Sequence, residues 1–214
     1  MLEQILKGGS MMVPLMLCSL VCLAVVYDRW LAFRANRRID TRAMRAKIQA
    51  CLRAGDADGA IAECVTAGGP VASVLLVGLR SYVQLRAKNE GAETMRMVVG
   101  QVMADYGSQA MGVVNKRLDV LTTIGTAAPL FGMTGTVTGM ITSFAGIAAA
   151  GSVGGGGGVV AAGIAEALIT TAAGLLIALG AVIPQSVYNR WSDEIELEIE
   201  EAAADVLEFI LTHH

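Results

Sequence analysis

The sequence predicts an all-α integral membrane protein with three transmembrane helices and long helical cytoplasmic extensions. Hydrophobic residues make up 54% of the 214 residues, and charged residues make up only 16%. A soluble domain of this size usually carries about 25% charged residues. The charged residues are also unevenly placed, because they alternate with uncharged stretches long enough to cross a bilayer.

Residues 1–27 are predicted to contain an N-terminal segment and the first membrane helix. No charged residue occurs from Gly8 to Tyr27, and a bilayer needs roughly 20 apolar residues. A cleaved signal peptide is the alternative, but no small-residue cleavage site follows the apolar run. Trp30 suits the membrane interface, so we expect this first span to be retained.

Residues 28–119 are predicted to form a cytoplasmic helical domain. Asp56 and Asp58 precede an apolar run and indicate a helix start. The Gly-Gly-Pro sequence at 68–70 indicates a break before the next helix. No strong breaker follows residue 92, so a long helix is expected to enter the second span.

The second and third membrane helices are predicted at 120–150 and 160–189, joined by a glycine-rich external turn at 151–159. Glu166 is the only charged residue in these three segments. The turn is expected because its run of consecutive glycines would cost about 1 kcal/mol per residue inside a helix, relative to alanine.

The basic residues predict the orientation of the chain. All Lys and Arg residues except Lys7 and Arg190 lie between Arg29 and Arg117. The positive-inside rule then places residues 28–119 in the cytoplasm, with the N-terminus and the glycine turn outside. The C-terminal segment is consequently expected on the cytoplasmic side.

Residues 190–214 are predicted to form an acidic, amphipathic C-terminal helix. Apolar residues recur at helical spacing, and these are Ile195, Ile199, Ala202, Val206 and Phe209. A neighbouring acidic stripe contains Glu194, Glu198, Glu201, Asp205 and Glu208. The stripe is interpreted as the solvated face of a packed helix, with a docking surface as the alternative.

Glu166 is the strongest functional candidate. A charged group deep in a bilayer is costly, so such residues usually face a protein interior or a water-filled cavity. Counted from Val159, Glu166 lies about 10 Å along the third span at 1.5 Å per residue. The predicted membrane segments contain no Lys, Arg or His that could pair with it. Removal from water favours the protonated form of a carboxyl group, so Glu166 could bind and release a proton.

Two other readings of Glu166 remain open. It could be a protonated acid that forms a hydrogen bond between helices, or a residue at the outer membrane interface. Helical periodicity places small or hydroxylated residues around Glu166 and leucines on the opposite face. The first set is Gly163, Thr170, Ala173, Ile177 and Ala181, and the second is Leu168, Leu175 and Leu179. This pattern is typical of a pore-lining helix and equally of tight helix packing.

The second span has a matching pattern of small and hydroxylated residues. Four glycines recur every seven residues and predict a close helix contact, namely Gly125, Gly132, Gly139 and Gly146. Most of its threonines are expected to bond their own helix, while one or two could order water near a proton pathway. These threonines are Thr122, Thr123, Thr126, Thr134, Thr136, Thr138 and Thr142.

No enzymatic motif or cofactor motif is recognised. The four cysteines show neither metal-ligand nor disulfide spacing. His213 and His214 at the chain end resemble the remnant of a tag and carry no functional argument. We find no nucleophile–base pair or phosphate-binding loop, so the chain is not expected to be an enzyme, and no cofactor is expected beyond protons as coupling ion.

Two segments resemble the ExbB/TolQ/MotA family of proton-channel subunits, specifically its ExbB/TolQ branch. They are APLFGMTGTVTGMITSF at 128–144 and GIAEALITTAAGLLIALGAVIPQSVYN at 163–189. The likeness covers the second and third spans strongly and the preceding regions more loosely. The sequence departs from the family pattern at Thr138, where members often carry an aromatic residue. Three spans also disfavour the MotA branch, which typically has four.

The resemblance implies roles for particular residues. The pore glutamate of the family falls on Glu166, and its two pore threonines fall on Thr136 and Thr171. Pro129 matches the proline of the second span. Thr171 lies about 140° around the helix from Glu166, whereas Thr170 shares its face, so both threonines are retained as candidates for the proton pathway.

The resemblance also implies assembly as a ring, a pentamer in the bacterial inner membrane. Its partners would be an ExbD/TolR-like single-span protein and a TonB/TolA-like protein that acts at the outer membrane. The expected function is proton conduction that energises this partner system with the proton motive force. A non-conducting scaffold that assembles the partner complex is the alternative, and a small transporter is a third reading, although no internal repeat supports it.

Overall fold

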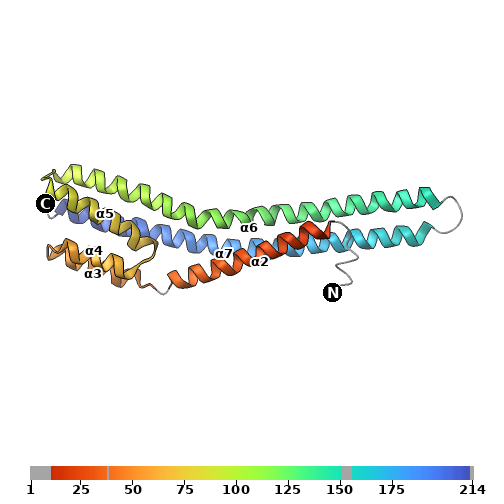
Figure 1. The fold of residues 1–214 in the computed structure, drawn as a ribbon, viewed down its shortest axis with the longest axis horizontal. Helices are drawn as coiled ribbons and strands as arrows, with labels where there is room; N and C mark the ends of the chain where they lie inside the picture. The colour runs from red at the N-terminus through yellow and green to blue at the C-terminus, as the bar shows by residue number, and fades with distance from the viewer. Residues whose placement is uncertain (1–10, 38, 151–155, 213–214) are drawn as a thin grey trace. The chain divides into compact units, whose positions relative to one another are not determined.

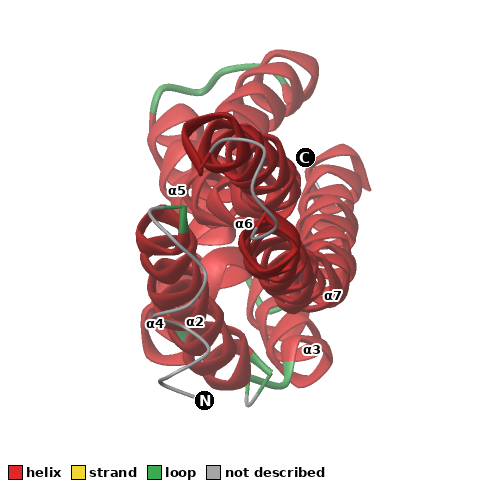
Figure 2. Cartoon of the chain, turned by 90° about the vertical axis from the view of Figure 1, so that its right-hand side faces the viewer, coloured by secondary structure: helices red, strands yellow, loops and turns green. Residues whose placement is uncertain are grey.

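The structure, a computed structural model, describes residues 11–37, 39–150 and 156–212. The elements of these residues are all helices, and no strand occurs among them (Figures 1 and 2). The predicted all-α fold class is therefore confirmed. The helices are α2 (Met12–Asn36), α3 (Thr41–Arg53), α4 (Ala57–Ala67), α5 (Gly69–Ala87), α6 (Ala92–Ala150) and α7 (Gly156–Thr212).

Three helical segments are long and apolar enough to cross a membrane, as predicted. They are Met12–Asn36 in α2, Ala92–Ala148 in α6 and Val160–Thr212 in α7. Only 17%, 22% and 28%, respectively, of the apolar window of each segment is buried inside the chain. Their large side chains consequently face outward; Leu17 and Leu176, for example, are each 69% exposed. Such surfaces suit lipid or further protein chains.

Short polar caps define the helices between the first and second spans. The Asp40 carboxylate accepts a hydrogen bond of 3.0 Å from Ala43 N at the start of α3, and the Asp56 carboxylate accepts one of 2.8 Å from Gly59 N at the start of α4. Each cap satisfies a backbone N–H that has no partner within the helix. The predicted break at 68–70 coincides with the junction of α4 and α5, where Gly68 and Gly69 have φ values of 67° and 84°.

The glycine-rich turn is shorter at its C-terminal end than the predicted range 151–159, because α7 already begins at Gly156. The first N–H groups of a helix have no acceptor within the helix. The free-energy cost of about 1 kcal/mol per glycine applies inside a helix, so it is too large for the glycines in the first turn of α7. Residues 151–155 of the predicted turn lie outside the described residues.

The chain divides into two compact units. The first contains the described residues of Met1–Arg29 and Arg117–Val187, and the second those of Trp30–Lys116 and Tyr188–His214. The first unit thus combines one part each of α2, α6 and α7. The second combines α3, α4 and α5 with the remaining parts of those three helices.

Aromatic rings at the start of the second unit's α7 segment pack inside that unit. The ring of Phe33 stacks on Tyr188 at 5.5 Å between centroids and meets Trp191 edge-on at 5.6 Å. The guanidinium of Arg37 lies 5.2 Å from the Trp191 ring centroid. Tyr188 is only 4% exposed, so it is a core residue of this unit, whereas Trp30 is 43% exposed.

Candidate functional site

In the first unit, α6 and α7 pack with their backbones in direct contact. A Cβ atom added at Gly174 would lie 2.6 Å from the carbonyl oxygen of Ala128. One added at Gly132 would lie 3.0 Å from Cα of Thr171. Both obstacles are backbone atoms, which cannot move aside as a side chain can. The contact therefore leaves no room for a Cβ at Gly174 and little room for one at Gly132. It also shows which residues of the two helices lie side by side.

The other predicted packing residues have different surroundings. A Cβ atom added at Gly125 would lie 2.7 Å from Cγ2 of Val182. One added at Gly139 would lie 3.0 Å from Cβ of Ala167. Gly146 is half-buried. Pro129 is half-buried inside α6. Three of the four glycines that recur every seven residues thus face α7.

Glu166 lies on α7 beside this helix contact. Its side chain is half-buried, and its chain neighbour Ala167 packs against Gly139 of α6. Among the described residues, the Glu166 carboxylate has neither a hydrogen bond nor an ion pair. The structure therefore places an acid without a cationic partner in the apolar part of α7.

The two candidate threonines that follow Glu166 make different contacts. Thr170 is 1% exposed, and its hydroxyl donates to the backbone carbonyl of Glu166 at 3.0 Å. The Thr171 hydroxyl donates across the helix contact to the carbonyl of Gly132 at 3.0 Å, and also to Ala167 O at 3.2 Å. Thr171 therefore joins the two helices, in addition to the pathway role that the resemblance implies.

Thr136 lies on α6, about one helical turn from the level of Glu166, because Gly139 is beside Ala167. Its hydroxyl donates to the carbonyl of Met133 at 2.6 Å. Each of the other six threonines of the second span also donates to a carbonyl of its own helix. The hydroxyls of this span therefore use their protons on the backbone.

Because these hydroxyl groups donate to the backbone, they can act only as hydrogen-bond acceptors toward other groups. A hydroxyl has one proton to donate and two lone pairs that accept. When the proton is used on the backbone, the oxygen can still accept a hydrogen bond from water or from a protonated carboxyl group. The Thr136 oxygen can therefore accept a hydrogen bond from a group outside its own helix.

Gln185 forms a polar contact between α6 and α7 that was not expected from the sequence. Its side-chain amide on α7 donates to the hydroxyl oxygen of Thr122 on α6 at 2.6 Å. Helical periodicity alone could not show this pair, because it depends on how α6 and α7 align. The available signal was an amide side chain inside a segment that is otherwise apolar.

The acidic stripe of the C-terminal helix belongs to the second unit and is partly paired with α3. Arg45 bridges Glu201 at 2.6 Å and Asp205 at 2.7 Å, and the Thr41 hydroxyl donates to Glu198 at 3.0 Å. The apolar residues Ile195, Ile199, Ala202 and Val206 are buried. The stripe therefore contributes to packing of a helix bundle, in addition to facing solvent at Glu194 and Glu208.

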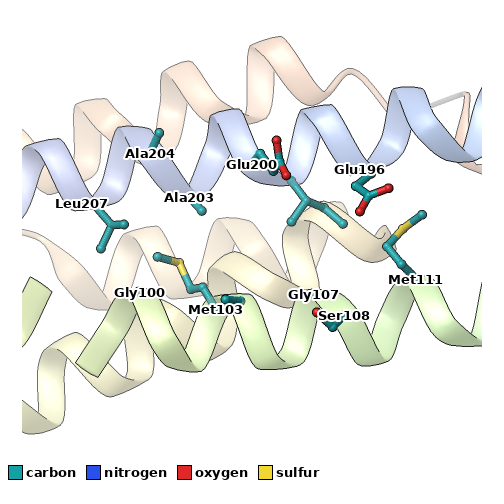
Figure 3. Close-up of a pocket in the computed structure, with 12 residues that line it drawn as sticks. Gly100, Met103, Gly107, Ser108, Met111, Glu196, Glu200, Ala203, Ala204 and Leu207 are labelled. Atoms are coloured by element: carbon teal, nitrogen blue, oxygen red, sulfur yellow. The ribbon is translucent and has the colours of Figure 1, made fainter. Parts of the chain in front are cut away.

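The second unit also contains a groove of about 370 Å³ between α6 and α7. Its apolar lining includes Gly107 and Met111 from α6 and Leu207 from α7 (Figure 3). Its acidic lining residues are Glu196 and Glu200. No group of three or more His, Cys, Asp or Glu that could hold a metal ion occurs in the described part of the chain.

Together, the three apolar helical segments and the lone acid define a multi-pass α-helical membrane protein with an ionisable group in one of its spans. Residues 66–201 match the model of the MotA/TolQ/ExbB proton channel family. The chain belongs to this family, which confirms the resemblance found in the sequence.

Several curated proteins are similar to most of the chain. The biopolymer transport protein ExbB-like 1 of Synechocystis sp. is 33% identical over 187 residues, which cover 86% of this chain and 68% of that protein. Biopolymer transport protein ExbB of Pseudomonas putida is 28% identical over 207 residues, 94% of this chain and 60% of that protein. The Tol-Pal system protein TolQ of Pseudomonas aeruginosa is 34% identical over 130 residues, 60% of this chain and 54% of that protein.

Proposed function

We propose that this chain is the proton-conducting subunit of an inner-membrane motor. The motor would use the proton motive force to energise an ExbD/TolR-like and TonB/TolA-like partner system that acts at the outer membrane. The similarity to proteins named ExbB and TolQ supports this proposal. The chain would assemble as a ring, a pentamer, with its N-terminus outside and its C-terminus in the cytoplasm.

One observation carries the proposal, namely the half-buried Glu166, whose carboxylate has no cationic partner among the described residues. An ionisable residue within a membrane span is costly and commonly marks an ion or proton pathway. The exposed apolar sides of the three spanning segments leave room for further subunits and for a partner helix around it.

In this mechanism, a proton from the outer side neutralises Glu166. The change of charge alters the contact between the ring and the partner's membrane helices, which carry an aspartate of their own and rotate or rearrange. Release of the proton to the cytoplasm restores the carboxylate. The membrane potential contributes about 2.3 kcal/mol per charge per 100 mV to this cycle.

The decisive variant is Glu166→Gln, which keeps the shape of the side chain and removes its acid. We expect the variant to assemble with its partners but to lose proton flux and energy coupling. The flux is measured as valinomycin-driven proton uptake by membrane vesicles that contain the full complex, and assembly is measured by co-purification.

The scaffold reading makes the opposite prediction for the same variant. A subunit that only assembles its partners would retain full energy coupling with glutamine at position 166. Wild-type flux and coupling in the Glu166→Gln complex would therefore reject proton conduction through this residue and support the scaffold.

A further inference from the structure

The two helices of the close contact each contain a proline four residues after a glycine. Pro129 follows Gly125 in α6, and Pro184 follows Gly180 in α7. Proline has no backbone N–H, so it cannot donate to the carbonyl of the residue four positions before it. Within a membrane, such a carbonyl must find another donor, which a side chain, a neighbouring helix or an ordered water can supply.

The two glycines have different surroundings. At Gly125 an added Cβ would meet the side chain of Val182, whereas at Gly180 it would meet no atom within 4 Å. Gly180 is also exposed. No side chain of the described residues donates a hydrogen bond to its carbonyl. The Gly180 carbonyl therefore lacks its ordinary partner, the N–H of residue 184, and its oxygen has two lone pairs with which it can accept a hydrogen bond from water.

The position of Gly180 relates it to Glu166. Gly180 follows Glu166 by fourteen residues, which corresponds to about 21 Å along α7. At about 100° per residue, the two lie within about 40° of each other around the helix. Pro184, eighteen residues after Glu166, lies on the same side of the helix as Glu166. Gly180 thus lies on the face of α7 that bears the acid, nearer to the predicted cytoplasmic end of the span.

A second polar group lies at the same end of the span. The side-chain nitrogen of Gln185 donates to the Thr122 hydroxyl at 2.6 Å, and the hydroxyl of Thr122 is directed to Leu118 O at 3.4 Å. Gln185 is half-buried and Thr122 is exposed. The side-chain oxygen of Gln185 remains an acceptor that can bind water.

We propose that the Gly180 carbonyl and the Gln185 side chain bind water in a polar layer through which protons leave Glu166 for the cytoplasm. The inference rests on the proposed proton conduction and adds the part of the proton pathway between Glu166 and the cytoplasm. A proton released by the Glu166 carboxyl group passes to water as hydronium and reaches the cytoplasm through this layer. The carboxylate is then reprotonated from the outer side.

The first test is Pro184→Ala, which supplies the missing N–H to the Gly180 carbonyl. We expect proton flux per assembled complex to fall about fivefold, the factor that one hydrogen bond of typical net strength contributes. Flux is measured in membrane vesicles that contain the full complex, and co-purification of the partner measures assembly.

The second test separates water binding from packing at Gln185. Gln185→Leu removes the acceptor and is expected to lower flux to a similar extent, whereas Gln185→Glu keeps an acceptor oxygen and is expected to retain flux. Ser186→Ala serves as the matched control, because Ser186 is exposed on the side of α7 opposite to Glu166.

Two outcomes would overturn the inference. Unchanged flux in both Pro184→Ala and Gln185→Leu would show that no water layer at these residues limits conduction. Weaker co-purification of the partner in Pro184→Ala, with normal flux per assembled complex, would show that a partner helix occupies the carbonyl instead. Glu166→Gln, measured in parallel, decides the proposed function independently, because it loses flux in either case if that function is correct.

Discussion

The same helix, α7, contains glutamates in two contrasting environments. In the first unit, Glu166 is half-buried and has neither an ion-pair nor a hydrogen-bond partner among the described residues. In the second unit, Glu198 accepts from Thr41 at 3.0 Å, and Glu201 pairs with Arg45 at 2.6 Å. The same residue type is therefore used in two ways, because the glutamates of the second unit make polar contacts between α3 and α7, whereas Glu166 makes no such contact with the described residues.

The hydroxyl groups of the first unit follow a related rule. The threonines of its α6 segment donate to the backbone of their own helix, and Thr171 also donates to Gly132 across the contact. These groups need no partner outside the chain for their protons. The Glu166 carboxylate differs from these hydroxyl groups, because none of the described residues forms a hydrogen bond or an ion pair with it.

The largest expected effect comes from neutralising one glutamate in each unit, Glu166 or Glu201, and comparing the proton flux of the two variants. Glu166→Gln is expected to abolish proton flux, whereas Glu201→Gln is expected to leave flux within about twofold of wild type, because Arg45 retains Asp205 at 2.7 Å. Vesicle proton uptake and partner co-purification are measured for both variants. Equal losses of flux in the two variants would show that neutralising any acid of α7 disables the complex.

Much of this architecture was predictable from the sequence. The uncharged stretches correctly predicted three membrane-spanning helices, because bilayer thickness sets their length directly. Glu166 stood out for the same reason, as the only charged residue between Val120 and Asn189. These features depend on local composition, which does not require knowledge of how helices align.

The features that depend on alignment could not be predicted. The Gln185–Thr122 hydrogen bond and the Thr171–Gly132 contact join residues far apart in the chain. Helical periodicity shows that a residue lies on a given face, but it does not show which residue of another helix lies opposite. For the same reason, the sequence showed the acidic stripe but not that Arg45 of α3 pairs with Glu201 and Asp205.

An intermediate effect is expected from one substitution made in each unit. Gly174→Ala would place a methyl group against the carbonyl oxygen of Ala128, 2.6 Å away, and we expect it to destabilise the protein by about 1–3 kcal/mol, as overpacking typically does. Gly112→Ala has no atom within 4 Å of the new methyl group and is expected to stabilise α6 by up to about 1 kcal/mol.

Thermal unfolding of the detergent-solubilised protein measures both changes, and the two Tm shifts should have opposite signs. A stable Gly174→Ala variant would show that α6 and α7 separate easily and that the contact is not required for the fold. A destabilised Gly112→Ala variant would show that its surroundings in the assembled protein are closed by another chain.

The smallest expected effect concerns two thiols of the second unit. Burial raises the pKa of Cys64 from its ordinary value of 9.0 to about 11, and the neighbouring charge of Glu63 adds to the shift. Cys64 is 2% exposed, whereas Cys51 is half-buried. Because the thiolate is the reactive form, Cys64 should be alkylated by iodoacetamide at least about tenfold more slowly than Cys51 at pH 8.5.

The raised pKa of Cys64 also has a consequence for stability. The folded state holds the neutral thiol more tightly than the unfolded state does, so this contribution is fully present below pH 9 and is lost as the pH rises toward 11. A Cys64→Ala variant should therefore lose less stability than wild type between pH 9 and pH 11.

The alkylation rates of Cys64 and Cys51 are measured by mass spectrometry after timed alkylation, with the unfolded protein as control. Equal rates for the two cysteines in the folded protein would show that α4 opens readily.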